Sequence, residues 1–123
     1  MTRNRILLAE DNHDVRYVEA LTLERSFPDY ITEQFKDGGS LVKRLEMDVS
    51  DVALIVTDNQ MPVMEGNEII RNYAPKLKGV PFVLVYGGEE EIGERAVREG
   101  AFGYMLKPKF DLELLKKALE FSK

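Results

Sequence analysis

The sequence predicts an α/β fold: five parallel strands in one sheet, with a helix after each strand. Three observations predict it. Short apolar runs alternate with helical segments along the whole chain, and the runs are unbroken, as in strands buried on both faces. Glycine and proline mark the breaks between them. Strict alternation of strand and helix implies parallel strands joined by right-handed crossovers.

Length and composition exclude several classes of protein. The 123 residues suffice for one domain with a buried core, so we treat 1–123 as a single domain. The formal charge of −5 argues against a direct nucleic-acid surface. The absence of cysteine excludes disulfides and thiolate metal sites. No apolar run approaches the roughly 18 residues of a membrane span, and the first residues are too short for a signal peptide. We therefore expect a soluble cytoplasmic protein.

The predicted strands are apolar runs bounded by turn residues. They are 5–9, 30–35, 52–57, 82–85 and 103–106. The segment 30–35 alternates only loosely and is expected at a sheet edge. The segment 52–57 is the most strongly apolar.

The predicted helices follow these strands and begin at capping residues. They are 14–26, 40–46, 67–73, 89–99 and 112–121, with Asp14, Ser40 and Asp111 as expected N-caps and Gly100 as the end of the fourth. Periodicity predicts Val15, Val18 and Leu21 as the buried side of the first helix, and Ile92, Ala96 and Val97 as that of the fourth.

Five such units suit a flavodoxin-like, three-layer sandwich with the sheet order 2-1-3-4-5. In that order the first and third strands are neighbours, and ligands bind beyond their carboxyl ends. Glu10 and Asp11 follow the first strand, Asp58 follows the third, and Lys107 follows the fifth. Each alone is an ordinary loop, cap or surface residue, but together they predict a site at this edge.

Three carboxylates held together repel one another unless a cation lies among them. Mg²⁺ prefers such oxygen ligands. Zinc is not expected, because cysteine is absent and the one histidine, His13, is expected to be an exposed loop residue. Asp58 is the best candidate nucleophile, since an aspartate can form an acyl phosphate. Lys107 supplies positive charge, and phosphoryl transfer depends mainly on positioning and electrostatics.

Three segments resemble the receiver domain of two-component response regulators. They are Glu10-Asp11, residues 57–66 (TDNQMPVMEG) and residues 100–108 (GAFGYMLKP). The resemblance covers essentially the whole chain. It implies a CheY-like (βα)₅ domain, a phosphoprotein that takes a phosphoryl group from a sensor histidine kinase or a phosphotransfer protein.

The resemblance also implies residue roles. Asp58 would be the phospho-acceptor and Lys107 would contact the phosphoryl group. Glu10 and Asp11 would belong to the Mg²⁺ site, with Asp11 the more direct ligand and the backbone carbonyl of Gln60 the third protein ligand. The Lys107-Pro108 bond is expected to be cis.

The sequence departs from the family at the end of the fourth strand. The family has a Ser or Thr there, whose hydroxyl couples the phosphoryl group to a switch aromatic on the fifth strand. Here Tyr86 has that position, or Gly87 if the register is shifted by one, and Tyr104 matches the aromatic. This predicts altered coupling between phosphorylation and conformation.

Other functions remain as alternatives. The missing hydroxyl favours a phosphorylation-independent pseudo-receiver, an interaction module on the same fold. An aspartyl-phosphate phosphatase would carry a second Asp where Gln60 stands, and a flavin carrier would have a hydroxyl-rich loop where the acidic pair stands. As a receiver, the chain would be no enzyme beyond its own phosphotransfer and slow autodephosphorylation. By resemblance, an output domain or effector would use the face of 89–99, 103–106 and 112–121.

Overall fold

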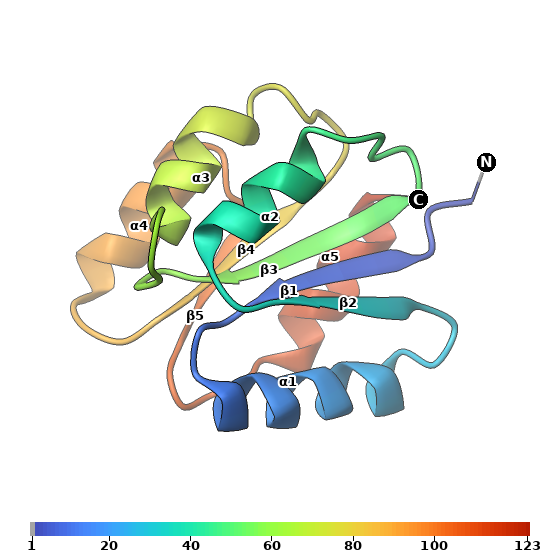
Figure 1. The fold of residues 1–123 in the computed structure, drawn as a ribbon, viewed down its shortest axis with the longest axis horizontal. Helices are drawn as coiled ribbons and strands as arrows, with labels where there is room; N and C mark the ends of the chain where they lie inside the picture. Colours follow the sequence, from blue (N-terminus) through green and yellow to red (C-terminus); the bar gives the residue numbers. More distant parts are fainter. Residues whose placement is uncertain (1) are drawn as a thin grey trace.

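The computed structural model describes residues 2–123 and contains one parallel five-stranded sheet in the order β2-β1-β3-β4-β5 (Figure 1). The strands are β1 (Arg5–Ala9), β2 (Ile31–Phe35), β3 (Val52–Asp58), β4 (Phe82–Tyr86) and β5 (Gly103–Leu106). The helices are α1 (His13–Ser26), α2 (Gly38–Leu45), α3 (Gly66–Tyr73), α4 (Glu90–Arg98) and α5 (Leu112–Phe121). The predicted flavodoxin-like order is confirmed, with the loosely alternating β2 at one edge.

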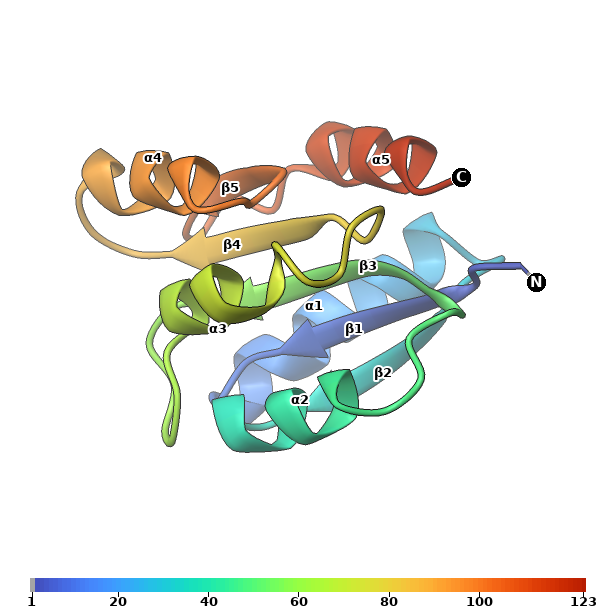
Figure 2. The same ribbon diagram turned by 90° about the horizontal axis from the view of Figure 1, so that it is seen from above.

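The helices cover both faces of the sheet (Figure 2), and the buried residues form two separate cores. Helices α1 and α5 pack on one face, and α2, α3 and α4 pack on the other. Successive strand residues point to opposite faces. In β1, Leu7 and Ala9 therefore join the core under α2–α4, while Ile6 and Leu8 join the core under α1 and α5. Burial on both faces explains why the strands are unbroken apolar runs.

The buried side predicted for α1 is wrong. Ala20 and Leu23 are the buried residues of this helix, whereas Val15 and Val18 are 37% and 59% exposed. Apolar residues lie on more than one side of α1, so periodicity could not select the side that packs. The predicted cap is also wrong, because the side chain of Asn12, not Asp14, accepts a hydrogen bond from the first turn.

Two further expectations are corrected and two are confirmed. Helix α2 is capped by the side chain of Asp37 rather than by Ser40, and Val97 on α4 is exposed rather than buried. Gly100, with a φ of +119°, ends α4 as expected. Asp111 caps α5 by accepting a hydrogen bond from a backbone N–H of its first turn.

Within residues 2–123, no helix is both long enough and apolar enough to cross a membrane.

Candidate functional site

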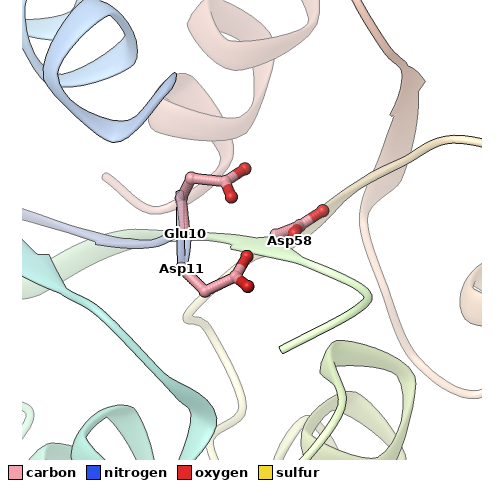
Figure 3. A group of neighbouring side chains, drawn as sticks. All are labelled: Glu10, Asp11 and Asp58. Carbon is pink, nitrogen blue, oxygen red and sulfur yellow. The ribbon is translucent and has the colours of Figure 1, made fainter. Parts of the chain in front are cut away.

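The structure brings the three predicted carboxylates together at the carboxyl edge of the sheet. Glu10 and Asp11 directly follow β1, and Asp58 is the last residue of the neighbouring β3. Each offers one oxygen such that the three lie within 4.8 Å of one another. The carboxylates of Glu10 and Asp11 extend toward the side on which Asp58 lies (Figure 3). Residues 48 positions apart in the chain thus form one acidic cluster, because β1 and β3 pair in parallel.

Lys107 reaches this cluster from the end of β5. Its Nζ lies 3.0 Å from an oxygen of Asp58 and 3.0 Å from Oε1 of Glu10. The backbone N–H of Lys107 donates to the carbonyl of Tyr86 at 2.7 Å, which ties the loop to β4. The Lys107-Pro108 bond is cis, as the resemblance implied. The lysine charge therefore bridges two carboxylates that face each other across the site.

Glu10 is fixed from several directions. Its side chain is only 1% exposed, and Oε2 accepts a hydrogen bond from the N–H of Asn12 at 3.0 Å. Its backbone N–H donates to the carbonyl of Phe35, and its carbonyl accepts from the guanidinium of Arg16 at 2.8 Å. Oε1 is also buried and is paired with Nζ of Lys107 at 3.0 Å. A buried carboxylate that shares its one cationic partner with Asp58 is suited to a further cation.

Burial and charge perturb the acids and the lysine of the site. Burial and, to a lesser degree, the neighbouring Glu10 together raise the pKa of Asp58 to about 6, against the opposing effect of Lys107. Burial opposes the charge of Lys107, but its bonds to Asp58 and Glu10 outweigh this and raise its pKa. The single lysine therefore does not fully compensate the acidic cluster.

The atoms around the cluster fit a hard divalent cation. The pocket at Asp58 is lined by Glu10, Asp11, Asn12, Val15, Asp58, Asn59, Gln60, Gly87 and Lys107. These residues offer carboxylate, amide and backbone oxygens but no sulfur or imidazole ligand, and such ligands suit a hard divalent cation. Glu10, Asp11 and Asp58 would hold the ion together with the carbonyl of Gln60. His13 lies outside this lining, is exposed, and contacts Asp14 at 3.3 Å.

The two candidate switch positions at the end of β4 face different environments. Tyr86 is fully buried in the core under α2–α4, where its ring lies 5.9 Å from that of Tyr104. Gly87 instead lines the pocket, and a Cβ added there would meet nothing within 4 Å. Tyr104 packs against α4 at Gly93, where any side chain would collide with its ring. Neither β4 position supplies a small hydroxyl beside Asp58.

Two residues near the site carried no sequence signal. Asn59 is buried, and its side-chain oxygen accepts from the N–H of Asn67 at 2.9 Å, so it caps α3 from eight residues away. Glu19 faces the site from α1, and burial followed by the charge of Glu10 raises its pKa to about 7. Both depend on packing between distant segments, which no local pattern encodes.

Comparison with known proteins agrees with this architecture. A model of the response regulator receiver domain family matches residues 6–120. Among solved structures, a response regulator receiver domain protein from Clostridium thermocellum superposes with a TM-score of 0.83 at 20% identity, covering 97% of this chain and 93% of that one. The structure named FixJ-N gives 0.82 at 24% identity, covering 98% and 96%.

Curated relatives differ in length. A chemotaxis protein CheY homolog of Campylobacter jejuni is 29% identical over 120 residues, which are 94% of this chain and 89% of that protein. The sensor kinase/phosphatase CqsS of Vibrio cholerae is 30% identical over 85% of this chain, and PhoP of Bacillus subtilis is 30% identical over 85%. The chain spans only 15% of CqsS and 42% of PhoP. With the five-stranded order and the acidic edge, these matches show that the chain belongs to the CheY-like receiver domains of two-component response regulators.

Proposed function

We propose that this receiver domain accepts a phosphoryl group on Asp58 in a Mg²⁺-dependent reaction and acts as a signalling switch. The observation that carries the proposal is the convergence of Asp58 with Asp11, Glu10 and Lys107 in one pocket. A nucleophile, oxygen ligands for a cation and a mobile positive charge are what phosphoryl transfer requires of a protein.

The chain's residues divide the work as follows. A carboxylate oxygen of Asp58 attacks phosphorus as the bond to the donor's leaving group breaks, and an acyl phosphate forms. Glu10, Asp11 and the Gln60 carbonyl would hold Mg²⁺, which offsets charge on the phosphoryl oxygens. Lys107, which bridges Asp58 and Glu10 before the reaction, moves onto the phosphoryl group. Attack by water later releases the group, so the domain catalyses only its own phosphorylation and slow dephosphorylation.

An apolar groove beside Lys107 supports a protein as the phosphoryl donor. It is lined by Asp14, Val15, Val18, Glu19, Thr22, Lys107, Pro108, Lys109 and Phe110. The exposed Val15 and Val18 of α1 lie in this groove. Val15 and Lys107 line both the groove and the pocket at Asp58, so the two adjoin. An exposed apolar patch at the rim of a polar site is typical of a protein interface. We assign it to a sensor histidine kinase or phosphotransfer protein, whose phosphohistidine would reach Asp58 from this side.

Phosphorylation by a small donor tests the proposal directly. Incubation with acetyl phosphate and Mg²⁺ should add one phosphoryl group, seen by intact-mass spectrometry. The adduct should disappear when the metal is chelated and should not form in Asp58→Asn. A phosphoryl group that persists in this variant would place the acceptor elsewhere.

We propose further that phosphorylation is coupled to the output face in an unusual way. Tyr86 fills the core beside Tyr104, and its ring leaves no room for Tyr104 to turn inward without displacing it. Effectors or an output domain would read the face of α4, β5 and α5, where Val97 and Leu106 are exposed. The absence of cysteine suits the cytoplasm, where we place the protein.

Beryllofluoride with Mg²⁺ separates this proposal from a phosphorylation-independent interaction module, which the buried Tyr86 also favours. We expect the amide NMR signals of Asp58, Asn59 and Gly87 to shift while those of Tyr104 change little. Gly87→Ser, which fits in open space, should extend the shifts toward β5. A spectrum unchanged at every position would instead favour the module that does not use phosphorylation.

A further inference from the structure

The β3–α3 loop, residues 59–65, carries Gln60 and has one strained residue. Val63 has a φ of +73° and its side chain is 80% exposed. A β-branched residue rarely adopts this left-handed conformation. Such strain persists only where the surrounding structure fixes the backbone. The surroundings of the loop must therefore hold it in place.

One end of the loop is held by Asn59. Its N–H donates to the carbonyl of Val85 on β4 at 2.9 Å, and its carbonyl accepts from Gly66 at 2.8 Å. Its side chain also caps α3 through Asn67. The start of the loop is therefore continuous with the sheet and with the first turn of α3.

The middle of the loop is held by Gly38, the first residue of α2. The N–H of Gly38 donates to the carbonyl of Pro62 at 3.1 Å. A Cβ on Gly38 would collide with the carbonyl oxygen of Met64 and would lie 2.8 Å from its carbonyl carbon. Because both atoms belong to the backbone, no side-chain rotation could relieve the collision. The loop can lie against α2 only because residue 38 has no side chain.

Gly39, the next residue in α2, faces side-chain atoms rather than the backbone of the loop. A Cβ on Gly39 would lie 3.0 Å from Cγ1 and 3.3 Å from Cβ of Val63, and 3.5 Å from Oδ1 of Asp37, so its three nearest neighbours are side-chain atoms. Rotation of the exposed Val63 side chain relieves the contact with Cγ1, and the contact with Cβ at 3.3 Å is relieved by a shift of a few tenths of an ångström, far less than the collision at Gly38 requires. Two adjacent glycines in one helix turn therefore differ in whether they constrain the path of the loop.

We propose that Gly38 is a positioning residue for the cation site, acting through the Pro62–Met64 backbone on the carbonyl of Gln60. This rests on the proposed function, in which that carbonyl is a ligand of Mg²⁺. Gln60 lies between the two anchors, at Asn59 and Pro62, so a displaced loop moves its carbonyl away from Asp11 and Asp58. Gly38 touches neither the cation nor the phosphoryl group.

A matched pair of variants tests the assignment. Mg²⁺ affinity is measured by following amide NMR signals of Asp11 and Asp58 during titration of the metal alone. Gly38→Ala should raise the Kd by about tenfold, as loss of a support behind a ligand commonly does, while Gly39→Ala should stay within about twofold of wild type. Saturating Mg²⁺ should restore the rate of phosphorylation by acetyl phosphate in Gly38→Ala, because the defect lies in binding.

Hydrogen exchange in the wild-type protein tests the same linkage without any variant. If the Gly38–Pro62 contact positions a ligand, metal binding must in turn stabilise that contact. Mg²⁺ should therefore slow exchange of the Gly38 amide. The amide of Val52, which donates to Val49 at the opposite end of the sheet, serves as the control and should not change.

The outcomes are distinguishable. A wild-type protein that binds no Mg²⁺ would defeat the proposed function itself. A wild-type protein that binds Mg²⁺, with both alanine variants equally affected or equally unaffected, would overturn the role of Gly38 alone. If Mg²⁺ did not slow hydrogen exchange of the Gly38 amide, the positioning role of Gly38 would also be overturned. This test uses the wild-type protein, so it holds even if Gly38→Ala does not fold.

Discussion

Replacing Asp58 with asparagine should abolish the phosphoryl adduct and, in the absence of metal, make the protein more stable. Asp58 is only 4% exposed in the wild type. Burial is the main cause that raises its pKa from 3.8 to about 6, and the nearby Glu10 contributes. A shift of this size makes the buried charge cost about 2–3 kcal/mol above that pKa. The neutral amide avoids the cost, so the free energy of unfolding in urea should rise by about this amount near pH 7.5.

The direction of the pKa shift of Asp58 determines the pH range in which its charge reduces stability. Because the folded-state pKa of Asp58 lies above the unfolded value, folding favours the protonated acid. The contribution of Asp58 to stability without metal should therefore be most favourable below about pH 4 and should be lost as the pH rises through about 6. Burial, followed by the charge of Glu10, raises the pKa of Glu19 from 4.5 to about 7. Ionisation of Glu19 therefore also lowers the free energy of unfolding as the pH rises. The difference between Asp58→Asn and wild type should vanish at the acid end.

Mg²⁺ and a distant variant supply the controls. Metal should stabilise wild type by mass action and narrow its gap to Asp58→Asn. Asp29→Asn removes an exposed carboxylate outside the site and should leave the profile as in wild type. The opposite result would be a lower free energy of unfolding for Asp58→Asn near neutral pH without metal. That result would show that Lys107 fully compensates the Asp58 charge, and it would contradict a raised pKa for Asp58.

Replacing Lys107 with methionine should move two properties of the site in opposite directions. Its Nζ lies 3.0 Å from both Asp58 and Glu10, so it competes with a cation for these carboxylates. Mg²⁺ should therefore bind the variant more tightly. Phosphorylation by acetyl phosphate should slow by about 100-fold, the usual loss when one charge-stabilising donor is removed from a transition state.

The control is Lys109→Met, which removes the same charge two residues away, from a side chain that forms no ion pair with any residue in 2–123. It should change neither property appreciably. Mg²⁺ titration by NMR and single-turnover phosphorylation measure the two effects separately. A fall in both metal affinity and rate for Lys107→Met would show that the lysine only supports the structure of the loop.

The positions of the chemistry-bearing residues could be predicted because they follow the most local signals in the chain. Asp58 ends a strand of seven residues, all of them buried, and such a strand is visible as an unbroken apolar run. Strict strand–helix alternation then fixes parallel pairing, which brings Glu10 and Lys107 to the same edge. The core side of α1 could not be predicted in this way, because Val15 and Val18 are as apolar as the residues that pack.

The order of the elements, the parallel sheet and the edge at which the acids meet follow from periodicity and chain connectivity, so they can be predicted from the sequence alone. The buried side of α1, the turn of Tyr86 into the core while Gly87 lines the pocket, and the need for Gly38 to lack a side chain became visible only in the folded protein. These features depend on close packing between segments distant in the chain. Such packing sets distances of a few ångströms that no local pattern of residues encodes.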